Sequence, residues 1–403
     1  MPMWLRRAQV PPPFLGERYE GLVDIAIEND RIVAVVPAHT VEPGTEGWDL
    51  GGGLVLPCLV DCHTHLDKAH TGERAPNPDG TFTGALAALE GDRKNWTASD
   101  LYQRMEFALD RSYRHGTRAI RTHLDVPPGQ LQISVAVFQE LQREWSSRIT
   151  LQAVSLISLD LFMGEYGEEV ANTFAKMGGI LGGVAYPHPD LVAQLDRVFS
   201  LAKDRQLALD FHVDETNDPH SQCLKAVAEA VLRHKFPYPV SCGHCCSLAL
   251  QAEETVRETI GLVAAAGINI ISLPTCNLYL QDRQPKCTPR WRGITLIHEL
   301  DQAGIPVAIA HDNCRDAFYP LGDHDLLQIF AIATLIGHLD NPYHYWLPCI
   351  TTTPARIMGI EPGLIAPGSP ADLLLFASRT YTELLSFPPQ DRQVLRNGKR
   401  IDT

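Results

Sequence analysis

The sequence contains little charge, few aromatic residues and no cluster of positive residues. Of its 403 residues, 20% are charged and 7% are aromatic, and the formal net charge is -14 at pH 7. No Lys/Arg cluster and no alternation of aromatic with basic residues appears along the chain. Because such a surface would repel a nucleic-acid backbone, we exclude nucleic acid as a partner and expect a small-molecule ligand.

Long apolar runs are absent as well. No stretch reaches the length that crosses a bilayer, and residues 1–7 run into the prolines at 11–13 without the apolar core of a signal peptide. These absences predict a cytoplasmic protein with no membrane partner.

The ten cysteines do not indicate a disulfide framework, because they are spread over a long chain rather than concentrated in a short one. Cys58 and Cys62, and the group Cys242, Cys245 and Cys246, also lack the paired CxxC spacing of a structural zinc site. We therefore interpret the cysteines as small, buried, reduced thiols.

Apolar, β-rich runs alternate with segments of helical length through the middle of the chain. The segments 98–115 and 191–206 carry apolar residues near the 3.6-residue period of an amphipathic helix. Eight strand-helix units are typical of a (β/α)8 TIM barrel, so we predict an α/β fold with that barrel over residues 57–359. The eight runs are residues 54–62, 118–126, 149–157, 179–186, 207–213, 239–243, 268–273 and 306–310.

Both ends of the chain carry hairpin signals instead. Residues 22–36 contain two β-branched runs joined by a polar turn, and residues 371–376 and 393–401 are strand-like, the latter with an Asn-Gly turn. Neither end can bury an apolar face alone. We therefore predict that residues 1–56 and 360–403 together form one small β-sandwich domain.

Two histidines, His63 and His65, end the first of the eight runs at positions i and i+2. On a strand this spacing turns both imidazoles to the same face. Later runs lead into His212 and Asp312, and the carboxyl ends of barrel strands meet at one mouth. We therefore expect these four residues to bind one divalent ion, Zn²⁺ or Fe²⁺, with a position left for water. The fourth run has no Lys that would bridge a second ion.

Such an ion can lower the pKa of bound water to about 7, which supplies hydroxide at neutral pH and favours hydrolysis. Glu215, three residues after His212, is placed for general acid/base work, with a solvated loop carboxylate as the alternative. His244 is interpreted as a group that polarises a substrate oxygen or orients the hydroxide, with a structural core histidine as the alternative. His123 and Lys68 are weaker pocket candidates, and a loop salt bridge is the alternative for Lys68.

A series of motifs runs in order along nearly the whole chain: His63-Thr64-His65-Leu66-Asp67, Arg121-Thr122-His123-Leu124-Asp125-Val126, His212-Val213-Asp214-Glu215, His244, Leu280-Gln281-Asp282-Arg283, Arg292-Gly293-Ile294-Thr295, His311-Asp312-Asn313 and Tyr319-Pro320-Leu321-Gly322. These motifs resemble the cytosine deaminase group of the amidohydrolase superfamily. The resemblance implies a barrel with a two-part β domain. It also implies metal ligands at His63, His65, His212 and Asp312, a proton shuttle at Glu215 and a hydroxide-activating role for His244. The predicted catalytic residues are thus Glu215, His244 and Asp312.

Three positions depart from the pattern of that group. By ungapped matching, Ser158 replaces a Gln that reads the pyrimidine amide edge, Asn313 replaces an Asp, and Phe318 replaces a Trp. A pocket that loses a polar partner loses discrimination, so these departures point away from cytosine itself. Lys68 and residues 312–316 also resemble the branch that hydrolyses N-substituted aminotriazines, which lacks the Glu found here at 215. The predicted substrate-binding residues are Lys68, His123, Ser158, Asn313 and Phe318.

We therefore predict a metal-dependent, cytosine deaminase-like hydrolase of C–N bonds other than peptide bonds. Hydroxide would attack a ring carbon of a small nitrogen heterocycle, and ammonia would leave. One alternative removes an N-alkyl amine from an aminotriazine-like ring; another is a cyclic amidohydrolase, which would prefer the missing bridging Lys. The intact Glu215 argues against a binding protein without turnover. The heterocycle is the expected partner, and we expect a homo-oligomer.

Overall fold

The computed structural model describes residues 2–17, 19–42, 44–386 and 392–401. The chain divides into two compact units. The first unit comprises Met1–Asp61, Asp110–Ala119 and Asp325–Thr403, and the second comprises Cys62–Leu109 and Ile120–His324. Residues 1, 18, 43, 387–391 and 402–403 of the predicted β domain lie outside the described residues.

Eight parallel strands form a closed (β/α)8 barrel, which confirms the predicted fold class. Strands β6 to β8 form one ladder and β9 to β13 another. The parallel bridges Val154–Ile180 and Ser158–Val184 join β8 to β9, and the bridge Thr64–Asp312 closes the circle between β6 and the end of β13. The strands are β6 (Leu59–Thr64), β7 (Thr117–Asp125), β8 (Thr150–Leu156), β9 (Leu181–Ala185), β10 (Leu209–Val213), β11 (Val240–His244), β12 (Asn269–Ser272) and β13 (Val307–Ile309).

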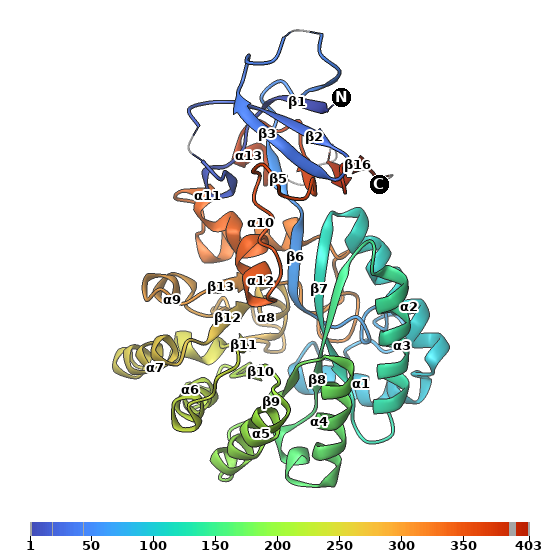
Figure 1. Cartoon of the computed structure of the whole chain (residues 1–403). Coiled ribbons are helices and arrows are strands. Elements are labelled where there is room, and N and C mark those ends of the chain that lie inside the picture. The colour runs from blue at the N-terminus through green and yellow to red at the C-terminus, as the bar shows by residue number, and fades with distance from the viewer. Residues whose placement is uncertain (1, 18, 43, 387–391, 402–403) are drawn as a thin grey trace. The chain divides into compact units, whose positions relative to one another are not determined.

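The helices of the second unit lie outside the strands, as Figure 1 shows for α4 to α7 around β9 to β12. The segment predicted at 191–206 is α5, whose residues Leu195, Val198, Phe199 and Ala202 repeat at helical spacing and are fully buried. Gln206 ends this helix in the left-handed conformation. The helices through this part are α1 (Phe82–Asp92), α2 (Ala98–Arg114), α3 (Leu131–Trp145), α4 (Glu165–Met177), α5 (Leu191–Arg205), α6 (Cys223–His234), α7 (Glu253–Ala266), α8 (Pro274–Leu280) and α9 (Ile297–Gln302).

The apolar run at 54–62 was predicted as one continuous strand, but the structure has two strands there. The first, β5 (Val55–Pro57), pairs antiparallel with β14 (Leu373–Leu375). At Cys58 the chain changes partners: its N–H donates to the Asp372 carbonyl, whereas the next N–H, of Leu59, donates to the Gly116 carbonyl. A continuous apolar run does not reveal this exchange, because both strands are buried.

The chain ends form two four-stranded sheets in the first unit, with strand orders β3-β2-β1-β4 and β16-β15-β14-β5. The predicted hairpins are present: β2 and β3 meet at a left-handed Asn29, and β15 and β16 meet at Asn397 and Gly398, both with positive φ. We retain the division into residues 1–56 with 360–403 and 57–359 as a proposal. The remaining elements are β1 (Met3–Ala8), β2 (Val23–Glu28), β3 (Arg31–Pro37), β4 (Gly47–Asp49), β15 (Gln393–Arg396), β16 (Lys399–Arg400), α10 (Leu326–Gly337), α11 (Tyr343–Trp346), α12 (Thr352–Ile357) and α13 (Tyr381–Leu384).

Helices of the length and apolarity that a bilayer crossing requires do not occur among the described residues.

Candidate active site

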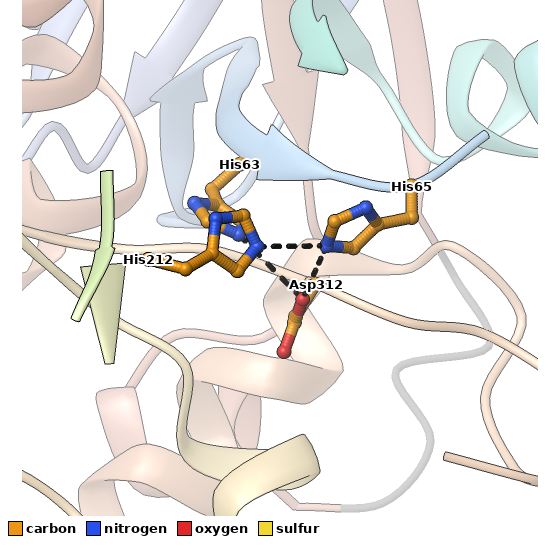
Figure 2. A group of neighbouring side chains, drawn as sticks. All are labelled: His63, His65, His212 and Asp312. Atoms are coloured by element: carbon orange, nitrogen blue, oxygen red, sulfur yellow. Dashed lines mark hydrogen bonds and ion pairs between the residues drawn. The ribbon is translucent and has the colours of Figure 1, made fainter. Parts of the chain in front are cut away.

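Four side chains converge on one buried point at the mouth of the barrel. Figure 2 shows four side chains pointing toward one another: His63 on β6, His65 just after β6, His212 on β10 and Asp312 in the segment that follows β13. The Nε2 atoms of His65 and His212 are 3.3 Å apart, and Asp312 Oδ1 lies 3.1 Å from His65 Nε2 and 3.6 Å from His63 Nε2. Ligand atoms around a tetrahedral Zn²⁺ with bonds of about 2.0–2.1 Å lie roughly 3.3 Å apart. The four residues therefore fit a single divalent ion.

The charge states of these residues suit metal binding. Burial, more than the neighbouring histidines, lowers the pKa of His63 and of His212 well below the usual value, so both imidazoles keep a lone pair for a ligand bond. Burial alone would raise the pKa of Asp312, but its hydrogen bond with His65 and the nearby His244 bring that pKa down to about 2. Neutral imidazoles and one carboxylate form a donor set typical of Zn²⁺ or Fe²⁺.

Gly243 leaves the space that His63 occupies. A Cβ atom at this position of β11 would lie 2.9 Å from His63 Cε1, closer than real Cβ contacts, and 3.1 Å from His63 Nδ1, closer than most of them. We therefore expect Gly243→Ala to displace the His63 ring and to weaken metal binding about 10- to 100-fold, the usual cost of disturbing a residue that supports a ligand. Competition with a metal chelator measures this affinity.

Gly261→Ala is the matched control, because no atom lies within 4 Å of a Cβ built at that position of α7. This variant should bind metal like the unaltered protein. If Gly243→Ala did so too, the space beside His63 would not matter for the metal site.

The chain leaves three strands in the left-handed conformation at the barrel mouth. Asp214, His244 and Asp312 have φ values of 54°, 70° and 65°, which for non-glycine residues costs on the order of 1–3 kcal/mol each. Asp214 is further fixed because its carboxylate accepts hydrogen bonds from Ser221 Oγ at 2.7 Å and from the backbone N–H of Cys223, where α6 begins, at 2.8 Å. This anchored turn sets the position of the following residue, Glu215.

Glu215, His244 and Asn277 form one hydrogen-bonded group beside the ligand cluster. Asn277 Nδ2 donates to His244 Nδ1 at 3.0 Å and to Glu215 Oε1 at 3.5 Å. Because Nδ1 of His244 accepts, its proton is on Nε2, and burial lowers the pKa of this histidine to about 4. Burial, and then the charge of Asp312, raise the pKa of Glu215 well above its usual value, so this carboxyl group holds a proton readily.

A cavity of about 220 Å³ opens beside this group. It is lined by His65, His212, Glu215, His244 and Asp312, and also by the predicted substrate-binding residues Lys68, Ser158, Asn313 and Phe318. A second cavity of about 410 Å³ shares Phe82, Val184, Tyr186, His212 and Glu215 with the first.

Lys68, a charged residue on the cavity wall, is held by a carboxylate. Lys68 Nζ lies 2.9 Å from Asp125 Oδ2. Burial lowers the pKa of this lysine, but the charges of Asp125 and Asp67 outweigh burial and raise the pKa above its usual value. The same ammonium group lies 4.8 Å from the centre of the Phe318 ring. The loop salt bridge considered for Lys68 is therefore present, and it lies in the cavity wall.

His123 lies outside both cavities. Its ring is completely buried, with its centre 3.9 Å from that of His63, and its Nε2 is 3.9 Å from Asp210 Oδ1. Neither cavity is lined by His123. The His123 ring therefore packs against His63 and does not face either cavity. The predicted substrate contact of His123 is therefore not supported by the cavity lining, and its ring contacts His63 instead.

With the fold and this geometry established, comparison with known proteins gives the family. A model described as "Amidohydrolase family" matches residues 111–402, which is more than half of the chain. The chain belongs to the amidohydrolase family.

This amidohydrolase is similar along its whole length to enzymes that act on nitrogen heterocycles. It is 48% identical over 394 residues to a pterin deaminase of Rhizobium rhizogenes (strain K84), covering 96% of this chain and 90% of that protein. It is 27% identical to an N-isopropylammelide isopropyl amidohydrolase of Pseudomonas sp. (strain ADP), covering 96% and 95%. Among solved structures, a 5-methylcytosine deaminase from Klebsiella pneumoniae liganded with 5-fluorocytosine superposes with a TM-score of 0.88 at 27% identity, covering 99% and 97%.

These similarities confirm the predicted superfamily, the barrel and a hydrolase that acts on C–N bonds. One residue of the amidohydrolase site, Asn277, was missed by the sequence reasoning. It lies on α8, a helix of seven residues, and the chain shows no second motif around it. A signal was available: Asn277 follows the seventh strand closely, at the barrel end where polar residues are most often functional.

Proposed function

We propose that this amidohydrolase removes the exocyclic amino group of pterin by hydrolysis, giving ammonia and the corresponding 2-oxo ring. The observation that carries the proposal is the group of Glu215, His244 and Asn277 beside four convergent metal ligands, in a chain 48% identical to a pterin deaminase. A carboxyl group that can take up and release a proton, a neutral imidazole and a metal cage are what hydrolytic deamination requires.

A bicyclic ring suits the cavity. Ser158, which lines the cavity, is shorter than the Gln that cytosine deaminases by resemblance carry at this place, so room remains for a second ring. The adjoining cavity of about 410 Å³, which Tyr186 also lines, adds to the available space. Lys68 and Asn313 provide polar atoms at the wall for the edge of the ring.

A divalent ion held by the three histidines and Asp312 would supply hydroxide at neutral pH, because it lowers the pKa of bound water to about 7. The protein's part is proton movement and orientation. As the water oxygen bonds to the ring carbon, the ionised Glu215 takes one water proton and then gives it to the exocyclic nitrogen, so that the C–N bond breaks and ammonia leaves. The other water hydrogen stays on the new oxygen, and the resulting 2-hydroxy ring is a tautomer of the 2-oxo product. His244, with its proton on Nε2, orients the oxygen by hydrogen bonding.

Removal of an N-alkyl amine from an aminotriazine is the second candidate, favoured by the 27% identity to an N-isopropylammelide isopropyl amidohydrolase. The presence of Glu215 supports deamination over this reaction, because by resemblance the aminotriazine branch lacks that Glu.

A substrate panel tests the proposal. Metal-loaded protein is assayed for ammonia or amine release from pterin, cytosine, 5-methylcytosine, isoguanine, creatinine and an N-alkyl aminotriazine. We expect kcat/KM for pterin to exceed the others by about tenfold or more, since an ill-fitting ring loses on the order of 1–3 kcal/mol. Faster turnover of another ring, or none of pterin, would reject the substrate.

The size of the pocket at Ser158 gives a further prediction. Ser158→Gln should fill the space proposed for the second ring and lower kcat/KM for pterin by roughly tenfold or more, with metal content unchanged. Steady-state kinetics with pterin and cytosine measure the change, and the loss should be greater for pterin. Ser147→Gln, at an exposed position after α3, is the control and should leave both values as they are. Equal losses for both substrates would contradict the assignment of this space.

The occupancy of the catalytic cage by a single ion, zinc or iron, is likewise part of the proposal. The homo-oligomer and the cytoplasmic location stay predictions.

A further inference from the structure

A second cluster of metal-binding residue types lies on the loop that follows β13. His311, Cys314 and His324 each offer one ligand atom, and these three atoms lie within 4.8 Å of one another. All three residues are buried, with exposed fractions of 1%, 1% and 4%. None of the three lines either cavity of the active site. We infer that these residues form a second metal site, distinct from the catalytic cage, which binds a soft divalent ion such as Zn²⁺ through one thiolate and two imidazoles.

The spacing of the cluster is close to that of a bound ion. Zinc bonds of about 2.0–2.1 Å to nitrogen and 2.3 Å to sulfur place two nitrogens and one sulfur roughly 3.3–3.6 Å apart, so a contraction of about 1 Å closes the cluster on an ion. The rings of His311 and His324 already lie face to face, with centres 5.2 Å apart and planes 20° apart. A thiolate with two imidazoles is a donor set for zinc or copper and is unsuited to magnesium or calcium.

His70 orients His324 from outside the cluster. The Nε2 atoms of the two rings are 3.0 Å apart, so one donates a hydrogen bond to the other. Burial lowers the pKa of His70 to about 4, and the neutral ring can accept this bond. If His324 donates through Nε2, its Nδ1 keeps the lone pair for a metal, as in most histidine ligands, whose second nitrogen is engaged by a neighbour.

The backbone around the cluster is fixed by several hydrogen bonds. The N–H of His70 donates to the Cys314 carbonyl at 3.1 Å, and the N–H of Arg315 donates to the Leu321 carbonyl at 3.2 Å. Gly322 covers the cluster with a φ of 94°, and a Cβ there would lie 3.5 Å from both Cys314 Sγ and His311 Cε1. Ion binding would release the Cys314 proton to solvent and join the two ends of the 311–324 loop beside Asp312.

Cobalt provides a probe that separates the two sites. The catalytic cage contains no sulfur, so a thiolate-to-cobalt charge-transfer absorption in Co²⁺-loaded full-length protein would report only a site with a cysteine. We expect this absorption in the unaltered protein and in Cys276→Ser, which changes a cysteine whose sulfur lies within 4.8 Å of an Asp312 oxygen. We expect the absorption to disappear in Cys314→Ser and to weaken at least tenfold in His324→Gln. Because His324→Gln keeps the thiol, it tests the site even if Cys314→Ser folds poorly.

Zinc content should agree with the cobalt spectra. Elemental analysis after zinc loading and gel filtration should give about two ions per chain for the unaltered protein and about one for Cys314→Ser or His324→Gln. The inference is overturned if the unaltered protein shows no thiolate absorption, if the absorption survives in Cys314→Ser, or if zinc content is the same in all three proteins. These results do not depend on which substrate is deaminated.

Discussion

Glu215→Gln is expected to lower the turnover of pterin at least about a hundredfold while the metal content stays unchanged. Glutamine keeps the size of the side chain and can still hydrogen-bond to Asn277, but it has no proton to exchange. Positioned acid/base groups are typically worth ~10² to 10⁴ in rate. The measurement is kcat for ammonia release, with elemental analysis of the same sample.

Glu254→Gln is the matched control, because it makes the same chemical change at an exposed position in the first turn of α7. It should leave kcat as it is. If Glu215→Gln turned over pterin at nearly the unaltered rate with its metal in place, another group would have to carry the proton. The first group to test would be His244, whose Nδ1 lies 3.4 Å from Glu215 Oε1.

His212→Ala is expected to remove the catalytic metal and to lower kcat/KM by roughly 10³-fold or more. His212 is one of the four ligands and lies 3.3 Å from His65, so its loss opens the cage. A metal contributes several kcal/mol to such a reaction, which corresponds to a rate factor of roughly 10³ or more. Activity and metal content are measured together. In a Cys314→Ser background, which lacks the proposed second site, the metal content should fall from about one ion per chain to well below one.

His188→Ala serves as the control, since it removes an exposed imidazole that does not belong to the cage. Metal content and kcat/KM should be unaffected by it. Full metal retention in His212→Ala would show that the four-ligand cage is wrongly assigned.

Much of the barrel could be predicted because its strands are apolar runs flanked by amphipathic helices. The run at 207–213 became β10, Leu209–Val213, and the segment at 191–206 became α5, ending at Arg205. The split at Cys58 could not be seen, because β5 and β6 are buried alike and differ only in their partners. A run of apolar residues indicates that a strand is present. It does not indicate which strand pairs with it, because the pairing depends on residues far away in the sequence, such as Asp372.

The convergence of the four candidate ligands was predictable, because spacing on a strand and position at a strand end place His63, His65, His212 and Asp312 together. The positions of Asn277 and His123 were not. Asn277 makes two hydrogen bonds to residues more than thirty positions away. His123 packs against the His63 ring, and strand alternation alone does not show whether a side chain meets another ring or the cavity. The left-handed backbone at His244 and Asp312 is also invisible in the sequence, because neither residue is glycine.

Isotope labelling tests the central claim, hydrolytic deamination of pterin at this site, most directly. Metal-loaded protein is incubated with pterin in water enriched in ¹⁸O, and the product is analysed by mass spectrometry alongside an ammonia assay. The account predicts one ¹⁸O atom in each product ring and one ammonia released per ring converted, with both signals lowered at least about a hundredfold in Glu215→Gln. Recovery of unchanged pterin, or a product ring without ¹⁸O, would contradict it.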